Sequence, residues 1–257
     1  MLGSGLGKEA AIALAKRGHK IYATVHYEEE IEKIANYAKE NKLDIEVFKL
    51  DILLEEDRNL VLNYDIDTFI SNAAIGDSGS VAEIRIDRIK NVFETNVFSN
   101  IQITQLVLKK MIEKNIDGKL IFLSSLSGRV SLPFLSPYCA SKFALEAFIE
   151  SLKYELKILP NVNIQVCLIE PGAYATGFNK INYEKKYAWM NSKSYFKENY
   201  KKLKKNEDKI WETIELKNYD SIIDKYIKAV EDEKLKFRYT APKGQALATQ
   251  ISRVFKG

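Results

Sequence analysis

The stretch KLIFLSSLSGRVSLPFLSPYCASK (residues 119–142) predicts an apolar strand, a loop and the beginning of a helix, in that order. The apolar run ends just before Ser125, and Tyr138 and Lys142 follow on the expected helix. Because four residues make about one helical turn, the phenol and the amine project from the same face. A hydroxyl, a phenol and an ammonium group gathered in this way indicate chemistry.

The expected chemistry is proton transfer. A free tyrosine has a pKa of about 10, and a cation held close to the phenol favours the phenolate and lowers that pKa. Tyr138 beside Lys142 is therefore expected to act as a general acid or base near neutral pH. Ser125 is placed to donate a hydrogen bond to a carbonyl oxygen that gains negative charge. Taken alone, a Tyr and a Lys at this spacing are more often an ordinary exposed pair, so the assignment depends on the rest of the chain.

Strand and helix patterns alternate on both sides of this stretch. We expect one helix directly after the glycines at positions 3, 5 and 7, and a second helix, which carries Tyr138, after the loop that follows Ser125. The other expected helices cover residues 28–41, 54–63, 91–115, 220–232 and 244–255, and the expected strands cover residues 20–25, 45–52, 68–71, 119–124, 163–170 and 236–241. This alternation predicts an α/β fold with a doubly wound parallel sheet. Ligands of such sheets bind at the carboxyl ends of the strands, where all the suspected motifs fall.

Composition places the chain among ordinary α/β domains. Its 257 residues suit one domain over 1–257, in which residues 179–257 form a substrate lid and the C-terminal part. No apolar run approaches the roughly 20 residues that cross a bilayer, and no signal-peptide pattern opens the chain. We therefore expect a cytoplasmic protein without a membrane span. Cys139 and Cys167 make no disulfide framework, and no Cys/His spacing suggests a metal site.

Charge is distributed unevenly along the chain, whose net charge is +4. Residues 179–257 carry 19 Lys and Arg against 11 Asp and Glu, whereas residues 1–178 carry 20 against 24. Lysines mixed with glutamates favour a solvated surface over a nucleic-acid partner, so none is expected. The aromatic and basic segment 183–205 is compatible with a surface helix and equally with a lid whose aromatic side chains close over an apolar ligand.

The motifs, in order along the chain, resemble those of the short-chain dehydrogenase/reductase family, which implies a Rossmann-type sheet. GSGLG (3–7) resembles the end of the family's glycine-rich loop, LDI (50–52) the segment beside the adenine ring, SNAA (71–74) the turn after the next strand, and PGAYAT (171–176) the family's PGxxxT. Asn96 and Ser125 stand where the family keeps catalytic residues, with Tyr138 and Lys142 at the family's spacing. The resemblance implies cofactor contacts from Gly3, Ser4, Gly5, Leu6, Gly7, His26, Asp51, Ile52, Asn72, Ala73, Ala74, Tyr138, Lys142, Pro171, Gly172 and Thr176.

What the resemblance implies is hydride transfer between a nicotinamide and the carbon of an alcohol/carbonyl pair. In the reductive direction Ser125 holds the developing oxyanion and Tyr138 donates the proton. Lys142 lowers the tyrosine's pKa and binds the nicotinamide ribose, and Asn96 holds a water molecule that resupplies protons through Lys142. Thr176 binds the nicotinamide carboxamide.

The choice of cofactor depends on the end of the strand at 20–25. An acidic side chain there binds the ribose 2′-hydroxyl of NAD, and a basic one accommodates the 2′-phosphate of NADP. Val25 and His26 occupy these positions, and no carboxylate follows until Glu28. The pattern favours NADP(H) over NAD(H), although His26 is mostly neutral at pH 7 and an ordinary surface histidine is an equally good interpretation.

Several functions remain compatible with the motifs. The leading one is reduction or oxidation of an apolar alcohol/carbonyl substrate by an oxidoreductase that uses NADP(H). A 3-oxoacyl thioester reductase, whose basic region receives an acidic carrier protein, is an alternative, and so is a non-catalytic dinucleotide-binding scaffold or sensor. Relatives often pair through the helices that carry Asn96 and Tyr138, which implies a homo-dimer or homo-tetramer.

The chain departs from the family's pattern at its start. The family's first strand and first loop glycine are missing, and that strand normally lies between the strands expected at 20–25 and 68–71. Each backbone group left unpaired and buried there costs about 1–3 kcal/mol, against a total stability of about 5–15 kcal/mol. The chain as given is therefore expected to lack roughly ten to fifteen native residues, through a misplaced start or a real truncation, and in the case of a real truncation to fold poorly and to bind its cofactor weakly. Ala74, in place of a turn glycine, is a milder departure.

Overall fold

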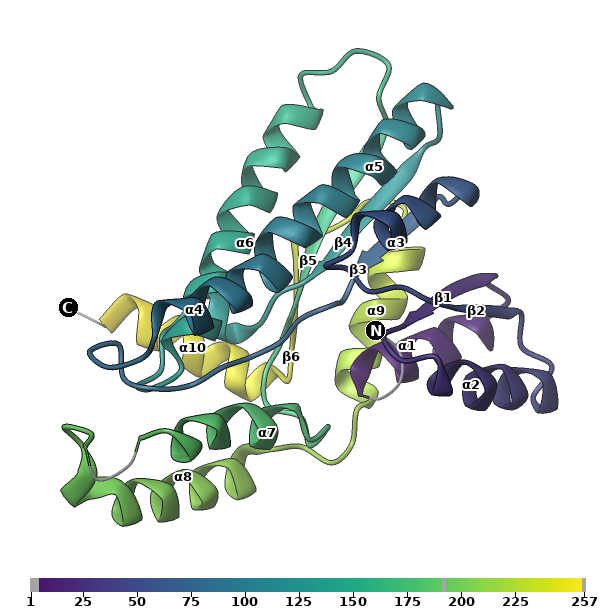
Figure 1. The fold of residues 1–257 in the computed structure, drawn as a ribbon. Helices are drawn as coiled ribbons and strands as arrows, with labels where there is room; N and C mark the ends of the chain where they lie inside the picture. The colour runs from purple at the N-terminus through teal and green to yellow at the C-terminus, as the bar shows by residue number, and fades with distance from the viewer. Residues whose placement is uncertain (1–4, 191–192, 256–257) are drawn as a thin grey trace.

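Parallel strands alternate with helices through the computed structural model, which describes residues 5–190 and 193–255. Every strand pair in these ranges is parallel, and the helices lie on both faces of the strands (Figure 1). The predicted α/β, doubly wound parallel fold is confirmed. The strands are β1 (Ile21–Val25), β2 (Ile45–Lys49), β3 (Thr68–Ser71), β4 (Gly118–Leu123), β5 (Ile164–Pro171) and β6 (Arg238–Ala241).

Most helices lie at the predicted positions, but the helix expected over 54–63 becomes a 3-10 helix after Asn59, and the helix Phe178–Glu184 was not expected. The helix expected over 91–115 is two helices joined by a π-helical turn, Glu94–Phe98, and segment 183–205 is broken by short 3-10 turns. No helix within the two described ranges is long and apolar enough to cross a membrane. The helices are α1 (Leu6–Ala15), α2 (Glu29–Glu40), α3 (Glu55–Asn59), α4 (Ile86–Phe93), α5 (Ser99–Glu113), α6 (Ser136–Leu156), α7 (Phe178–Glu184), α8 (Tyr200–Ile214), α9 (Asp220–Glu231) and α10 (Lys243–Phe255).

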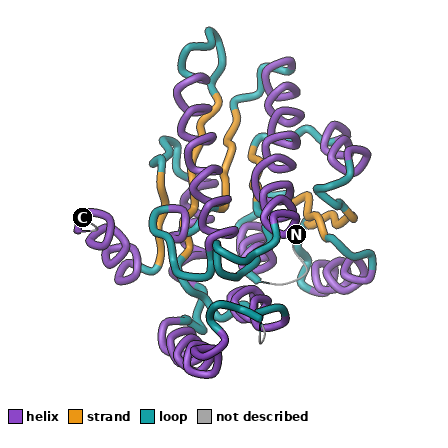
Figure 2. Tube along the Cα trace, turned by 60° about the vertical axis from the view of Figure 1, so that its left-hand side comes forward, coloured by secondary structure: helices purple, strands orange, loops and turns teal. Residues whose placement is uncertain are grey.

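Alternating side chains of the central strands fill two separate cores. Successive residues of a strand point to opposite faces, so Leu120 and Phe122 join the core beneath α5 and α6, which contains Leu145. Ile121 joins the other core with Tyr226 of α9. In Figures 1 and 2 the long helices α5 and α6 run beside the strands, and α7 and α8 lie together at one end.

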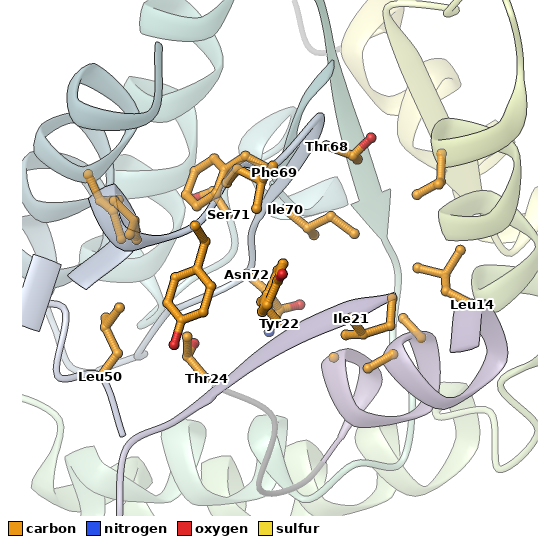
Figure 3. Close-up of a pocket in the computed structure, with 18 of the residues that line it drawn as sticks. Leu14, Ile21, Tyr22, Thr24, Leu50, Thr68, Phe69, Ile70, Ser71 and Asn72 are labelled. Carbon is orange, nitrogen blue, oxygen red and sulfur yellow. The ribbon is translucent and has the colours of Figure 1, made fainter. Parts of the chain in front are cut away.

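The sheet is interrupted between β1 and β3. β1 pairs with β2, and β3, β4, β5 and β6 form a separate four-stranded sheet in that order. A cavity of about 370 Å³ lies between the two parts. Figure 3 shows Tyr22 and Thr24 of β1 on one side of this cavity and Phe69 to Asn72 on the other. We call it the inter-sheet cavity, and it lies where the sequence predicts the gap.

Candidate active site

A second cavity, of about 540 Å³, follows the carboxyl ends of the strands. We call it the strand-end cavity. Because the strands are parallel, the loops that leave β1, β3, β4 and β5 meet at this one edge. Most of the residues that the sequence assigned to cofactor or catalysis line it: Gly5, Leu6, Gly7, His26, Asn72, Ala74, Ser125, Tyr138, Lys142, Pro171, Gly172 and Thr176. Gly3 and Ser4 lie outside the described residues.

The beginning of α1 fits a phosphate group. Gly5 precedes the helix with φ of 76°, a left-handed conformation that residues with a Cβ atom rarely adopt. A Cβ atom on Gly5 would lie 3.6 Å from Cβ of Thr176, an ordinary contact, so the positive φ and not crowding favours glycine here, and the loop lies beside the segment that follows β5. The first backbone N–H groups of a helix lack partners within the helix, and its dipole favours an anion there. The dinucleotide implied by the motifs therefore fits this end of the cavity.

Ser125 and Tyr138 lie together at the end of β4. Ser125 Oγ accepts a hydrogen bond from the Ser127 N–H at 3.1 Å and donates a long one, 3.4 Å, to the Pro171 carbonyl. Tyr138 occupies the first turn of α6, and its ring packs against that of Phe178 with 5.6 Å between the ring centroids. Burial raises the pKa of Tyr138 to about 12, and the neighbouring Ser125 hydroxyl offsets only part of this rise.

Lys142 is buried one turn beyond Tyr138. Its Nζ donates a 2.6 Å hydrogen bond to the Leu123 carbonyl and lies 5.8 Å from the centroid of the Tyr138 ring. Burial lowers the pKa of Lys142 to about 8. The prediction that Lys142 lowers the pKa of the phenol is therefore wrong for this structure. Both groups lose water on burial, which disfavours phenolate and ammonium alike, and neither group contributes to the pKa shift of the other.

This correction favours one direction of proton transfer. With a pKa of about 12, Tyr138 keeps its proton at neutral pH and is suited to donate it. With a pKa of about 8, Lys142 is still mainly charged at pH 7. A charged ammonium group stabilises the phenolate that remains once Tyr138 has given up its proton.

The lowered pKa of Lys142 predicts a specific pH dependence of stability. Between pH 8 and 10.5 the unfolded chain binds more protons at this residue than the folded chain does, so the free energy of unfolding rises with pH. Over the whole interval the rise amounts to about 3 kcal/mol. Urea denaturation across this interval should show a rise smaller by about that amount in Lys142→Met. Lys201→Met, at an exposed position, should match the wild type, and identical pH profiles for all three proteins would contradict the prediction.

Asn96 does not reach the strand-end cavity. It lies fully buried on the π-helical turn, where its Oδ1 accepts from the Ile75 N–H at 2.8 Å. Its Nδ2 donates to the Ile75 carbonyl at 2.8 Å and to Ser141 Oγ at 2.9 Å. Ser141 in turn donates to the Tyr138 carbonyl at 2.8 Å. The Asn96 side chain therefore ties the loop after β3 to the helix that carries Tyr138.

Three further predicted residues lie outside the strand-end cavity. Ile52 is part of the core beneath α5 and α6, and Ala73 lines the inter-sheet cavity. Asp51 accepts a hydrogen bond from the Leu53 N–H at 3.0 Å. Its carboxylate also lies 3.9 Å from Nδ1 of His26, so it borders the site through that histidine.

A charge cluster packs against α6, the helix that carries Tyr138 and Lys142, and the sequence analysis missed it. Ser124 Oγ donates to Glu146 at 2.7 Å, and Arg238 donates to the other oxygen of Glu146 at 2.9 Å. Nε of Arg238 also lies 2.8 Å from the carboxylate of Glu170, the residue before the last one of β5. Glu146 stands one turn beyond Lys142, and that spacing could have identified it. Arg238 has no local signal, because it reaches the cluster only through the pairing of β6 with β5.

The segment after β5 forms the outer wall of the strand-end cavity. Phe178 and Ile181 of α7 and Trp211 and Ile214 of α8 line it. The Trp211 ring stacks on that of Tyr183 with 5.7 Å between centroids. No described residue of segment 183–205 lines the cavity, which is covered instead by the flanking residues of α7 and α8. The segment's own aromatic side chains pack elsewhere, Tyr183 on Trp211 and Tyr187 on Tyr200, so the interpretation of 183–205 as a lid of aromatic side chains is wrong for this structure.

Dinucleotide-binding α/β proteins typically combine a parallel sheet with a glycine-rich turn before a helix. This chain has both, and Ser125, Tyr138 and Lys142 lie at the ends of its strands. The model of the short chain dehydrogenase family matches residues 2–186, so the chain belongs to the short-chain dehydrogenase/reductase family.

Individual relatives agree with this assignment. A Helicobacter pylori protein described as a probable short-chain type dehydrogenase/reductase is 37% identical over 182 residues, which cover 70% of this chain and 65% of that protein. Human retinol dehydrogenase 8 is 33% identical over 184 residues, 68% of this chain and 57% of that protein. The matched part of the chain thus spans less than two thirds of these curated relatives.

Solved structures agree with the fold. A Burkholderia phymatum short-chain dehydrogenase/reductase in complex with NAD superposes with a TM-score of 0.79 at 16% identity, over 98% of this chain and 90% of that one. An actinorhodin polyketide ketoreductase with NADPH superposes with a TM-score of 0.78 at 20% identity, over 95% and 94% of the two chains. Structures in complex with NAD and with NADPH therefore share this fold.

Proposed function

We propose that the protein is an NADP(H)-dependent oxidoreductase that interconverts an alcohol and a carbonyl compound. The observation that carries the proposal is the strand-end cavity, a single space that joins the beginning of α1 and His26 to Ser125, Tyr138 and Lys142. A dinucleotide that extends from α1 along the strand ends would bring its nicotinamide to the three catalytic groups. We assign the whole of residues 1–257 to one domain with this function.

The reaction uses few protein groups. A nicotinamide cofactor, when bound, would supply the hydride and its two electrons that reduce the carbonyl carbon. Ser125 Oγ donates a hydrogen bond to the carbonyl oxygen as negative charge develops on it. Tyr138, protonated at neutral pH, donates its proton to that oxygen to complete the alcohol. Lys142 stabilises the resulting phenolate, and Asn96 fixes α6 through Ser141 while protons return through Lys142.

We propose an apolar substrate. The cavity wall beside Tyr138 carries Leu126, Val130, Leu132, Leu135, Phe178, Ile181 and Ile214. Burial of apolar surface against such a wall stabilises a complex by about 25 cal/mol per Å². One relative is described as a retinol dehydrogenase, whose named substrate is apolar. A panel of aldehydes and ketones of increasing chain length, followed at the NADPH absorbance, tests the proposal, and turnover confined to small polar carbonyls would contradict it.

The cofactor preference can be measured directly. His26 lines the adenosine end of the cavity and Val25 is fully buried, so the ordinary acidic position carries no carboxylate. Glu30 lines the same end, and its carboxylate would repel a 2′-phosphate. We expect tighter binding of NADPH than of NADH by fluorescence titration, and a reversed order for His26→Asp. Tighter NADH binding by the wild type would assign the cofactor to NAD(H), with Glu30 as the residue that holds the ribose.

We also propose that the chain forms a homo-oligomer through α5 and α6. The exposed side chains Phe98, Phe143, Phe148 and Tyr154 lie on or beside these helices. A second copy would remove their apolar surface from water.

A carrier-protein-linked 3-oxoacyl thioester is the second candidate substrate, and the exposed lysines of α8 at the same end of the molecule favour it. Turnover of a 3-oxoacyl thioester on an acidic carrier protein, together with inactivity toward free ketones, would select this alternative.

A further inference from the structure

The C-terminal helix α10 presents its large apolar side chains to solvent. Leu247, Ile251, Val254 and Phe255 are 62%, 51%, 76% and 77% exposed. The first three recur at the spacing that places residues on one face of a helix. The half-buried positions of α10 are instead Gln245, Ala246, Thr249 and Ser252. A helix that serves only the core has the opposite arrangement, so we treat the outward apolar face as a binding surface, the α10 ridge.

The α10 ridge lies beside the strand-end cavity. Gln245 donates to the Ile214 carbonyl at 2.8 Å and accepts from the Ala173 N–H at 2.7 Å, which anchors the beginning of α10 to the cavity wall. Ala248 and Thr249 line the cavity itself. In Figures 1 and 2 the helix then leads away from the sheet toward the marked C-terminus. Ile181 and Ile214 line the cavity and remain exposed, so they mark an apolar mouth near the ridge.

The neighbouring helix α8 turns two of its three acidic residues, Glu207 and Asp208, toward partners on adjacent segments, and leaves Glu212 and most of its lysines exposed. Glu207 pairs with the buried Lys186 at 2.6 Å, and Asp208 accepts from the Tyr183 hydroxyl at 2.8 Å. Four further α8 lysines are exposed, and among residues 5–190 and 193–255 none of them forms an ion pair: Lys201, Lys202, Lys205 and Lys209. The helix that forms the cavity wall therefore presents an excess of positive charge, four exposed lysines against the one exposed carboxylate of Glu212.

We propose that the α10 ridge and the α8 lysines dock the protein on the surface of an anionic lipid bilayer, with the cavity mouth facing the lipid. An amphipathic helix binds such a surface by burying its apolar face at the level of the headgroups, and nearby lysines add attraction to anionic lipids. The proposal concerns where an apolar substrate enters, and it does not depend on hydride transfer.

Charge favours a bilayer over a second copy of this chain. Residues 179–257 carry 19 basic against 11 acidic residues, so two copies that met through this region would repel one another. An acidic protein would satisfy the lysines, but its charged surface would leave the four apolar side chains of α10 without an apolar partner. Anionic lipid supplies both kinds of contact.

Co-sedimentation with vesicles tests the proposal. The probe is a vesicle that mixes phosphatidylcholine with phosphatidylserine, compared with phosphatidylcholine alone. We expect binding to the mixed vesicles that weakens as salt is raised from about 0.1 to about 1 M, because the Debye length falls from about 10 to about 3 Å. Ile251→Ser/Val254→Ser should weaken binding about tenfold or more, since both side chains lose their buried apolar area.

The matched control is Ile158→Ser/Leu159→Ser, which removes two exposed apolar side chains just after α6. It should bind vesicles as the wild type does, and both double variants should retain the wild-type circular dichroism and turnover of a water-soluble ketone. Absence of binding to mixed vesicles, or equal binding by the two double variants, would overturn the proposal.

Two other results would assign the ridge to a different partner. If Ile251→Ser/Val254→Ser has a lower molar mass than the wild type in light scattering, the ridge binds a second copy of the chain. If the ridge is needed to bind an acidic carrier protein and the protein does not bind lipid, the ridge belongs to that carrier-protein complex. A failure of hydride transfer in all variants would count against the proposed enzyme and leave the vesicle result unaffected.

Discussion

Replacement of Tyr138 by Phe is expected to lower kcat about 10²–10⁴-fold, the usual contribution of a positioned general acid. The substitution removes only the hydroxyl, and the ring remains packed against Phe178 in the first turn of α6. The dissociation constant for NADPH should therefore change little, because the backbone groups of α1 and the rest of the strand-end cavity are untouched. Stopped-flow hydride transfer and fluorescence titration of the same preparation check both parts.

Tyr154→Phe is the control for this prediction. Tyr154 lies on the same helix but is 52% exposed and is not among the residues that line the strand-end cavity. It should leave kcat unchanged. If Tyr138→Phe keeps wild-type turnover, the proton comes from another group and the proposed mechanism fails. If the wild type itself shows no turnover yet binds NADPH tightly, the chain is the non-catalytic scaffold or sensor.

Filling the inter-sheet cavity is expected to raise the melting temperature by about 10–20 °C. The edges of β1 and β3 that face this cavity take part in no strand ladder of the described residues, and each unpaired buried backbone group costs about 1–3 kcal/mol. In a chain of this size each kcal/mol recovered raises the melting temperature by about 2–4 °C. A fusion that places six β-branched residues and a Thr-Gly turn ahead of Met1 supplies an extended partner for both edges.

Calorimetry of residues 1–257 and of the fusion, each with and without NADPH, measures the effect. We expect residues 1–257 to have a low melting temperature that NADPH raises only slightly. The fusion should have a higher melting temperature and a larger shift on adding NADPH. A fusion with prolines at alternate positions is the control, because proline cannot donate to a strand ladder. The prediction is contradicted if residues 1–257 melt at a high temperature and show a clear shift with NADPH, and the fusion changes neither. The backbone groups of β1 and β3 that face the cavity would then already have hydrogen-bond partners.

Much of the site could be predicted because its motifs are local. The spacing of Tyr138 and Lys142 determines that both lie on one helix face, and the alternation of strands and helices brings the loops together at one edge. Asn96 was identified as part of the catalytic set, but its side chain bonds to Ile75 and Ser141 instead of reaching the cavity. No spacing reveals such partners, because Ile75 comes from a loop 21 residues earlier in the chain.

The sequence by itself determined the parallel α/β fold, the family and the set of groups that gather at the strand ends, since periodicity and spacing act over a few residues. Tertiary structure alone decided the direction of the pKa shifts of Tyr138 and Lys142, because desolvation depends on everything packed around a group. It also decided the charge cluster around Arg238, which forms only when β6 pairs with β5, and the outward apolar face of α10. Burial results from contacts between distant segments, and neither its cost nor its direction can be read from neighbours in the chain.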